Sequence, residues 1–348
     1  MRALVTAELS EAGRARLEAL GYEVARDGWG VTRQVLDRGA LVAAAAGARL
    51  LVVEIETVDA AVLDALPGLA VVATARGAPT NVDLAAATDR GIPVLHTPAR
   101  NAASVADFTI GLILAQCRGL ARGQDHLRRV GWHVDGELPY LHFRGPELAG
   151  RTLGLVGYGA VGREVARRAA GGFAMRVLAF DPYVADPGPP VQAVPLDRLL
   201  AESDVVSLHC PLTSETTGLI GPAELARMPA HAVLVNTARA GVVDEAALVA
   251  ALERGTLAGA ALDVYWSEPL PRDHPLLGFD NVTLTPHLAG AADDVVVHHS
   301  AMIVDDVEHL LAGRRPRHLA NPSVWPGAAV AAGRGDGGHA PAPEGAGS

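Results

Sequence analysis

Three side chains that could bind a carboxylate and move a proton follow apolar segments in the second half of the chain. Arg239, Glu268 and His287 come just after the segments AVLVN, AALDV and NVTLTP, respectively. Each segment has the length and apolar character of a buried strand. The carboxyl ends of parallel strands meet at one edge of a sheet, where ligands bind. We therefore expect the three side chains to lie close together.

Together the three residues suit the interconversion of a 2-hydroxy acid and a 2-oxo acid. The Arg239 guanidinium is a planar fork of donors that fits a carboxylate and can polarise a neighbouring carbonyl. His287 could donate a proton when a 2-oxo group is reduced and accept it in the reverse direction. Glu268 could hydrogen-bond the other imidazole nitrogen and favour its protonated form. Taken singly, each residue could equally be an ordinary surface charge, and His287 is one of 13 histidines.

The segment LVGYGAVG supplies a candidate site for a hydride carrier. Gly157, Gly159 and Gly162 form G-x-G-x-x-G between an apolar segment and a helix-compatible one, and Asp181 ends the next apolar segment. In a dinucleotide-binding unit these glycines allow a tight turn, approach of the pyrophosphate and close helix packing. A carboxylate at Asp181 can accept hydrogen bonds from ribose hydroxyls and would repel a 2′-phosphate. The pattern therefore favours NAD over NADP.

The alternation of short apolar segments with helix-like ones predicts an α/β fold with two parallel sheets, each covered by helices. The expected strands are 3–6, 49–54, 69–74 and 92–97 in a first sheet, and 152–157, 176–181, 204–210, 232–238, 258–265 and 281–286 in a second. The expected helices are 11–20, 58–66, one long helix over about 104–129 capped by Asn101 or Ser104, 163–170 and about 293–311.

Composition indicates two domains and limits the kinds of partner. The chain has 348 residues, of which 49% are hydrophobic, and a formal net charge of −10. This acidic balance disfavours electrostatic binding to nucleic acid or to an anionic membrane. Cys117 and Cys210 lie far apart, which argues against a disulfide framework and indicates a reducing compartment. We see no signal-peptide core or bilayer-spanning segment, so we expect a cytoplasmic protein.

These motifs together resemble the D-isomer-specific 2-hydroxyacid dehydrogenases, and in particular a phosphoglycerate-dehydrogenase-like subset. The resemblance covers residues 1 to about 322 and is carried by LVGYGAVGREVARR with Asp181, LHCPLTSETTGLI, LVNTARAGVVDEAALVAAL, ALDVYWSEPLP and TPHLAG. It implies an NAD-dependent enzyme that interconverts a D-2-hydroxy acid and its 2-oxo acid. Candidate substrates are 3-phosphoglycerate and the glyoxylate/hydroxypyruvate pair, and a branched or aromatic 2-oxo acid or a sugar acid stays open. The resemblance also implies a homodimer formed through the nucleotide domains.

The resemblance assigns roles to individual residues. It implies that Arg239, Glu268 and His287 are catalytic. The NAD contacts that it implies are Gly157, Gly159, Ala160, Val161, Gly162, Asp181, Cys210, Thr216, Thr237, Ala238, Asp263, Ala289 and Gly290. The substrate contacts expected are Arg76, Gly77, Arg239 and His287.

The resemblance also implies an NAD-binding Rossmann domain inserted into a discontinuous substrate domain. We expect the inserted domain over 101–290 and the substrate domain over 1–100 and 291–325. The Gly-, Ala- and Pro-rich tail over 326–348 should be disordered. In the substrate domain, His96 stands where the family usually has Asn and Ala99 where it has Gly. The departures leave the identity of the hydroxy acid open.

Two other functions compete with this interpretation. A formate dehydrogenase would carry Gln at the position of Glu268, which argues against that activity. A non-enzymatic, NAD(H)-sensing corepressor-like protein would share the fold and the three catalytic-type residues, and it stays as the alternative. His133 and His142 have no Asp, Glu or Cys partner at metal-ligand spacing, so no metal site is predicted.

Overall fold

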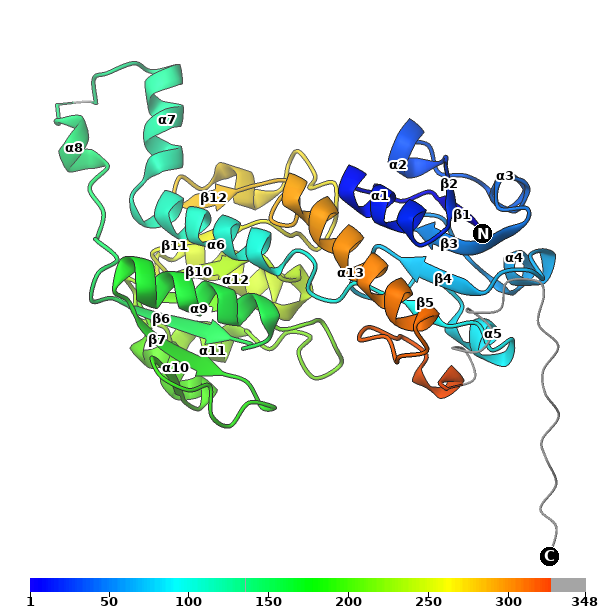
Figure 1. Ribbon diagram of the computed structural model, residues 1–348. Coiled ribbons are helices and arrows are strands. Elements are labelled where there is room, and N and C mark those ends of the chain that lie inside the picture. Colours follow the sequence, from blue (N-terminus) through cyan, green and yellow to red (C-terminus); the bar gives the residue numbers. More distant parts are fainter. Residues whose placement is uncertain (135, 327–348) are drawn as a thin grey trace, which may run out of the picture. The chain divides into compact units, whose positions relative to one another are not determined.

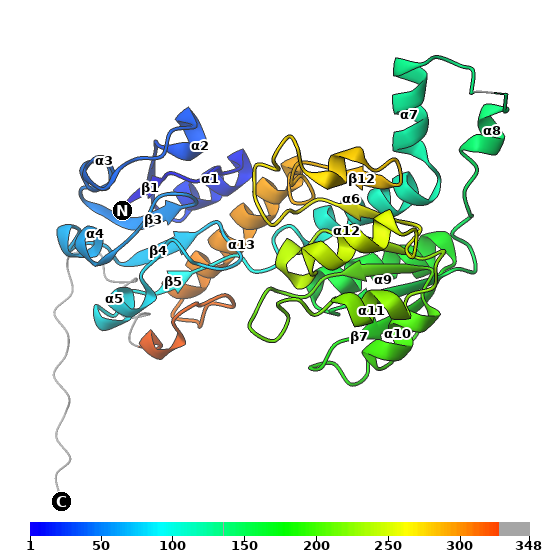
Figure 2. The ribbon, with the colours of Figure 1, turned by 180° about the vertical axis from the view of Figure 1, so that it is seen from behind.

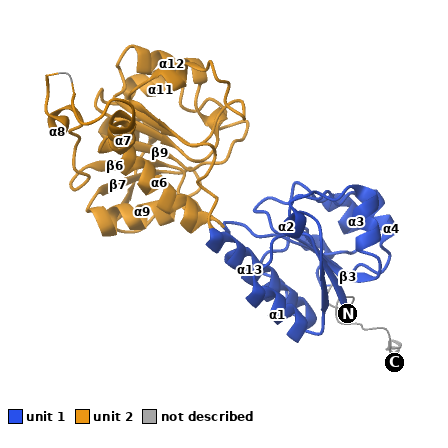
Figure 3. Ribbon diagram, turned by 90° about the horizontal axis from the view of Figure 1, so that it is seen from above, with its two compact units in different colours: residues 1–100, 293–348 blue, residues 101–292 orange. Residues whose placement is uncertain are grey.

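The computed structural model describes residues 1–134 and 136–326, which form two compact units (Figure 3). The terminal unit contains residues 1–100 and the described residues from 293 on, and the central unit contains residues 101–292. From residue 327 on, the tail expected over 326–348 lies outside the described residues. Each unit is built on its own parallel sheet, which confirms the predicted fold class.

The central unit has a seven-stranded sheet in which every pair of neighbours is parallel. The strand order is β12-β11-β10-β9-β6-β7-β8. The chain therefore moves in one direction from β6 to β8 and in the other from β9 to β12. In such sheets the ligand site lies where the direction reverses, here beyond the carboxyl ends of β6 and β9. The strands are β6 (Thr152–Val156), β7 (Arg176–Phe180), β8 (Val191–Ala193), β9 (Val205–Leu208), β10 (Val233–Asn236), β11 (Gly259–Leu262) and β12 (Val282–Leu284).

Helices cover both faces of this sheet. The helices α6 (Ala102–Cys117) and α9 (Ala160–Phe173) pack on one face (Figure 1). On the other lie α10 (Leu196–Glu202), α11 (Pro222–Arg227) and α12 (Glu245–Glu253) (Figure 2).

The alternation of side chains along β6 explains both cores. Leu153 and Leu155 join the cluster that contains Ile113 of α6. Val156 points to the opposite cluster, which contains Leu248 of α12. All five side chains are almost fully buried, so each face of the sheet contributes a hydrophobic core.

The terminal unit has a five-stranded parallel sheet of order β2-β1-β3-β4-β5. The strands are β1 (Arg2–Val5), β2 (Glu23–Arg26), β3 (Ala48–Val53), β4 (Val71–Thr74) and β5 (Val94–Leu95). One face packs against α1 (Glu11–Ala19) and α13 (Asp293–Leu311), and the other against α3 (Arg38–Ala44), α4 (Ala60–Ala65) and α5 (Leu84–Asp89). A short helix, α2 (Trp29–Thr32), follows β2.

Local sequence sets where several helices begin. Ser10, Asp37, Asp59, Asp83 and Asp244 stand just before α1, α3, α4, α5 and α12. In each case the side-chain oxygen accepts a backbone N–H from the first turn. Such a cap replaces a hydrogen bond that the helix itself cannot make.

The prediction of a single helix over about 104–129 was wrong. The chain forms α6 and then α7 (Leu120–Arg129), with Gly119 between them at a φ of 62°. A glycine in this left-handed conformation ends a helix, and no apolar periodicity reveals it. The short helix α8 (Pro139–His142) follows. The segments β2 and β8 were not expected either, because both are edge strands with polar and exposed residues.

No helix among the described residues is both long and apolar enough to cross a membrane.

A buried carboxylate ties the last described segment to the terminal sheet. Asp306 of α13 is 1% exposed. It accepts hydrogen bonds from the backbone N–H of Arg317 (2.6 Å) and from the backbone N–H and Nδ1 of His318 (3.1 and 2.8 Å). The carbonyl of His318 in turn accepts the N–H of His96, just after β5. Asp306 thus fixes the segment that pairs with β5.

Replacing Asp306 by Ala should destabilise the terminal unit by about 3 kcal/mol, because buried donors lose their acceptor. Urea unfolding of the full chain measures this loss. The matched control is Asp305→Ala, since Asp305 is half-exposed and pairs with Arg16 on the surface. The control should cost at most about 1 kcal/mol. Equal losses in both variants would contradict the role of Asp306.

Candidate active site

The three glycines of the loop after β6 meet different requirements: two are needed for packing within the protein, and one leaves space for a ligand. Gly157 has a φ of 97°, and a Cβ there would lie 2.7 Å from the backbone nitrogen of Cys210. A Cβ on Gly162 would overlap the carbonyl oxygen of Gly157. A Cβ on Gly159, in contrast, would have no described atom of another segment within 4 Å. Packing within the protein therefore requires two of the glycines, and Gly159 leaves open space in which a ligand can approach the backbone.

The loop leads into the N-terminus of α9, which offers free donors. Gly159 is the N-cap and brings no side chain to the first N–H groups, those of Ala160, Val161 and Gly162. Free N–H groups and the helix dipole make such an end suitable for a pyrophosphate. Arg163, in the same turn, donates from Nε to the carbonyl of Tyr158 (3.1 Å). The motif alone did not indicate this additional positive charge.

Asp181 follows β7 directly and is fixed beside the glycine loop. Its Oδ2 accepts the N–H of Tyr158 (2.8 Å), and its Oδ1 accepts the N–H of Tyr183 (2.9 Å). Each oxygen keeps a lone pair that can accept a ribose hydroxyl. The open glycine loop, the helix N-terminus and this carboxylate fit a dinucleotide such as NAD.

Two residues after β9 lie on the other side of this loop. His209 packs against Gly157 and Gly162, and its Nε2 lies 2.9 Å from the Ser207 hydroxyl. Burial lowers the pKa of His209 to about 4, so its ring is neutral. Burial, with a smaller effect of the Asp181 charge, raises the pKa of the Cys210 thiol. Both residues therefore present uncharged side chains to the nucleotide site.

A buried amide shapes the turn that carries Arg239. Asn236, at the end of β10, is 1% exposed. Its Oδ1 accepts the N–H of Ala238 and its Nδ2 donates to the carbonyl of Arg239, both at 3.0 Å. The hydroxyl of Thr237 points inward and pairs with that of Thr109 on α6 (2.9 Å). Sequence reasoning missed Asn236, whose only signal was a polar residue at the end of an apolar strand.

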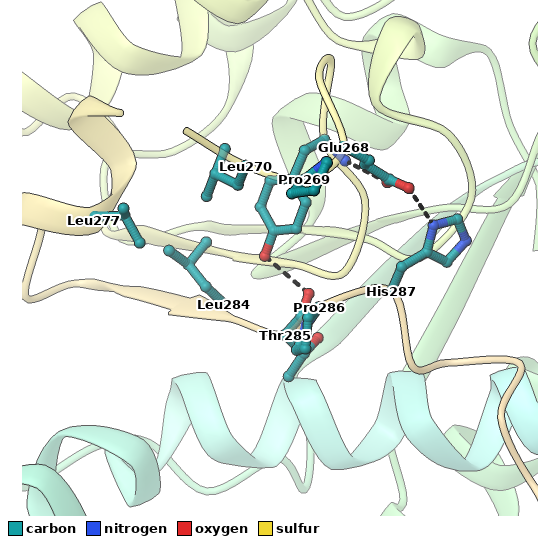
Figure 4. A pocket seen from close by; sticks show the side chains of 9 residues that line it. Glu268, Pro269, Leu270, Leu277, Leu284, Thr285, Pro286 and His287 are labelled. Atoms are coloured by element: carbon teal, nitrogen blue, oxygen red, sulfur yellow. Dashed lines mark hydrogen bonds and ion pairs between the residues drawn. The ribbon is translucent and has the colours of Figure 1, made fainter. Parts of the chain in front are cut away.

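Glu268 and His287 form a hydrogen-bonded pair at the ends of β11 and β12 (Figure 4). The Oε2 of Glu268 lies 2.8 Å from Nδ1 of His287, and its Oε1 accepts the N–H of Tyr265 (3.1 Å). The hydrogen bond with His287 lowers the pKa of Glu268 most, and the Tyr265 amide and the charge of Arg239 lower it further. Glu268 is therefore ionised, and Nε2 of His287 has no hydrogen-bond partner within the described ranges.

The turn that presents His287 is held by a buried carboxylate. Asp263 is fully buried. Its Oδ1 accepts hydrogen bonds from the Thr285 hydroxyl (2.6 Å) and the N–H of Leu288 (2.7 Å), and its Oδ2 accepts the N–H of Ala289 (2.8 Å). Asp263 therefore faces the inside of this turn. If Asp263 acts at the nicotinamide end of a cofactor, it does so through the residues of the turn to which it is hydrogen-bonded.

The remaining candidates fall into two places. In the central unit, the Thr216 hydroxyl donates to the carbonyl of Pro211 (2.6 Å), and a Cβ on Gly290 would lie 2.8 Å from Nδ2 of Asn101. Arg76 and Gly77 follow β4 in the terminal unit, where the carbonyl of Gly77 lies 2.8 Å from Nδ1 of His96. Arg76 and Gly77 thus belong to the terminal unit. The other candidate residues lie at one edge of the central sheet.

A largely apolar cavity of about 670 Å³ lies beside the Glu268–His287 pair (Figure 4). Leu270, Leu277 and Leu284 line it on the side away from His287. Its walls come from the segment between β11 and β12, from the last residue of β12 and from the turn that follows it.

Comparison with known proteins places the chain in a family. The NAD binding domain of the D-isomer specific 2-hydroxyacid dehydrogenases matches residues 110–289. A glyoxylate reductase of Thermofilum pendens is 42% identical over 279 residues, which are 79% of this chain and 81% of that protein. This chain belongs to the D-isomer specific 2-hydroxyacid dehydrogenases.

Two further proteins are similar to this chain over most of its length. A D-3-phosphoglycerate dehydrogenase of Archaeoglobus fulgidus is 37% identical over 331 residues, which are 94% of this chain but 60% of that longer protein. The crystal structure of the TT0316 protein from Thermus thermophilus superposes with a TM-score of 0.76 at 39% identity, covering 92% of this chain and all of that one.

The family fixes the class of reaction. This dehydrogenase is an NAD-dependent oxidoreductase that interconverts a D-2-hydroxy acid and its 2-oxo acid by hydride transfer. These matches favour the enzyme over the corepressor-like alternative.

Replacing Asp181 by Ser should lower the preference for NADH over NADPH, measured as the ratio of kcat/KM values, by about 10-fold or more. Loss of charged hydrogen bonds to the ribose costs about 1.5–3 kcal/mol. The control is Asp186→Ser, an exposed acid whose carboxylate accepts, among the described residues, only the N–H of Gly188. An unchanged ratio in the Asp181 variant would show that another group reads the ribose.

Proposed function

We propose that His287 is the acid–base group of this dehydrogenase, that Glu268 stabilises its protonated form and that Arg239 binds the substrate carboxylate. The observation that carries this proposal is the hydrogen bond between Glu268 Oε2 and His287 Nδ1 (2.8 Å). Because Nδ1 is engaged, Nε2 is the nitrogen that remains for a substrate. The side chain of His287 is half-exposed, so a ligand can reach it.

In the reductive direction, C2 of the 2-oxo acid would receive the hydride that NADH supplies when it is bound. His287 gives the proton on Nε2 to the substrate oxygen, which becomes the hydroxyl of the product. The Glu268 carboxylate stabilises the imidazolium before the transfer, and the Arg239 fork holds the substrate carboxylate in a fixed orientation. In the oxidative direction the neutral His287 accepts the hydroxyl proton.

We propose a small 2-oxo acid, glyoxylate or hydroxypyruvate, as the substrate that is reduced. The similarity to the glyoxylate reductase of Thermofilum pendens, which extends over 81% of that protein, supports this choice. The pair 3-phosphohydroxypyruvate and 3-phosphoglycerate is the second candidate. It is supported by Arg76, which has no ion pair in the described part of the chain and could contact a second anionic group.

We propose the terminal unit as the substrate domain, with Arg76 and Gly77 as its substrate contacts. The backbone of Gly77 is held by the hydrogen bond from His96, which gives this loop a fixed conformation. We also propose a cytoplasmic location. Two free cysteines and the use of an NAD pool support it.

We further propose that the dehydrogenase is a homodimer formed through its central unit. The segment from α7 to α8 lies apart from the central sheet (Figure 1). Large apolar side chains along it are exposed, among them Leu127 (55%), Val130 (69%), Trp132 (71%) and Tyr140 (69%). An exposed apolar set of this kind is typical of a surface that a partner covers.

Replacing His287 by Gln should lower kcat for reduction by about 100-fold or more, the usual contribution of a general acid. NADH oxidation would be followed with glyoxylate, hydroxypyruvate and 3-phosphohydroxypyruvate as separate substrates. The Kd of NADH, measured by fluorescence, should stay unchanged. The control is His231→Gln, because His231 lies before β10 and pairs with Asp204 away from the carboxyl ends of the strands. Full turnover by the His287 variant would refute the proposal.

The wild-type chain should elute as a dimer at micromolar concentration when its mass is measured by light scattering. Combining Leu127→Asp with Trp132→Ser should yield monomers, because both changes remove apolar area that a partner would cover. The control is Val31→Ser, which removes an exposed apolar side chain from the terminal unit. A monomeric wild type, or a double variant that stays dimeric, would contradict this assignment.

A further inference from the structure

Tyr265 contacts Glu268 and the turn that carries His287. Its backbone N–H donates to Oε1 of Glu268 (3.1 Å). Its phenol hydroxyl donates to the carbonyl oxygen of Thr285 (2.9 Å), two residues before His287. The same hydroxyl lies 3.2 Å from the carbonyl of Leu262, the last residue of β11. A single residue in the loop after β11, Tyr265, therefore fixes the orientation of Glu268 and contacts the turn that carries His287.

The turn needs to be held because His287 adopts an uncommon backbone conformation. Its φ is 56°, in the left-handed region that residues other than glycine rarely occupy. β12 is also an edge strand of the sheet, paired only with β11 among the described strands. Hydrogen bonds that tie this turn to a neighbouring strand of the sheet therefore come from the β11 side. Asp263 and Tyr265 both lie there.

The two side chains hold opposite sides of the turn. Asp263 accepts the hydroxyl of Thr285 and the amide N–H groups that follow His287. Tyr265 donates to the carbonyl of Thr285, which within the described part of the chain otherwise accepts only the N–H of His287 itself (3.0 Å). Without the phenol hydroxyl, Asp263 would still hold the amides. The peptide between Thr285 and Pro286 would lose the bond that ties it to the β11 loop.

A purely structural role would need only the aromatic ring. The ring lines the cavity of about 670 Å³ together with Leu270 and Leu284, and phenylalanine would fill the same space. The hydroxyl is the part that reaches the turn. Burial raises the pKa of Tyr265 to about 12, with smaller effects of the charges of Asp263 and Glu268. The phenol thus remains protonated, and so a donor, throughout the neutral range.

We propose that Tyr265 is a positioning residue for the acid–base pair, because its amide orients Glu268 and its hydroxyl fixes the turn that places His287. This inference rests on the proposed function, in which Glu268 stabilises the protonated form of His287. The hydroxyl acts by keeping the carboxylate and the imidazole at hydrogen-bond distance. It does not contact the reacting atoms.

The test is Tyr265→Phe, which removes the hydroxyl and leaves both the ring and the backbone N–H. We expect kcat for reduction to fall about 5- to 10-fold, the value of one hydrogen bond of about 1–1.4 kcal/mol. The KM of NADH should change less than about twofold, because the glycine loop and Asp181 are untouched. The hydrogen bond with His287 holds the pKa of Glu268 down, and a looser pair would weaken that effect. The pH profile of reduction should therefore change together with kcat.

Two controls make the outcome specific. Tyr22→Phe removes a buried phenol hydroxyl from the terminal unit and should leave kcat and the pH profile unchanged. His287→Gln, assayed alongside, tests the proposed function separately. If the His287 variant turns over normally, the acid–base assignment itself fails. If that variant is inactive while Tyr265→Phe keeps the wild-type kcat and pH profile, the positioning role alone is overturned.

Discussion

The geometry of the Glu268–His287 pair depends on a carboxylate that is buried from solvent. Asp263 is fully buried, and burying a charge costs free energy unless hydrogen bonds replace its hydration. Three donors from the turn after β12 do so, at 2.6 to 2.8 Å. The same bonds draw the turn back toward β11 and allow His287 to occupy its left-handed conformation. The cost of burying Asp263 is thus offset by bonds that also set the site.

The glycine loop after β6 also has to meet two requirements, one from packing within the protein and one from the space that a ligand needs. Gly157 and Gly162 are required by contacts within the protein, since a Cβ on either would meet backbone atoms. Gly159 is under no such internal requirement, because the space beside it is open. A stable fold could therefore accept a side chain at Gly159, whereas a pyrophosphate at the expected place would meet it. This difference would separate the residues that build the loop from the one that admits the ligand.

The sequence was sufficient to predict the strand ends that carry the chemistry, because a parallel sheet places those ends at one edge. Arg239, Glu268 and His287 follow β10, β11 and β12, which are neighbours in the sheet. The residues that orient them were not predicted. Asn236 and Tyr265 act through backbone carbonyl and amide groups, and neither periodicity nor motif spacing reveals those partners.

The break between α6 and α7 was missed for a similar physical reason. Apolar periodicity continues past Cys117, and the pattern alone therefore favours one long helix. The change of direction comes from the left-handed Gly119 and from Gly145, where a Cβ would overlap the carbonyl oxygen of Cys117.

The net charge of the chain also fails to indicate the local properties of the site. At −10 the chain should repel anionic ligands, but charges farther away than about 8 Å are largely screened at physiological ionic strength. With the roles proposed here, binding of NAD and of a 2-oxo acid would depend on local donors such as Arg239, Arg163 and the free N–H groups of α9, which the overall composition conceals.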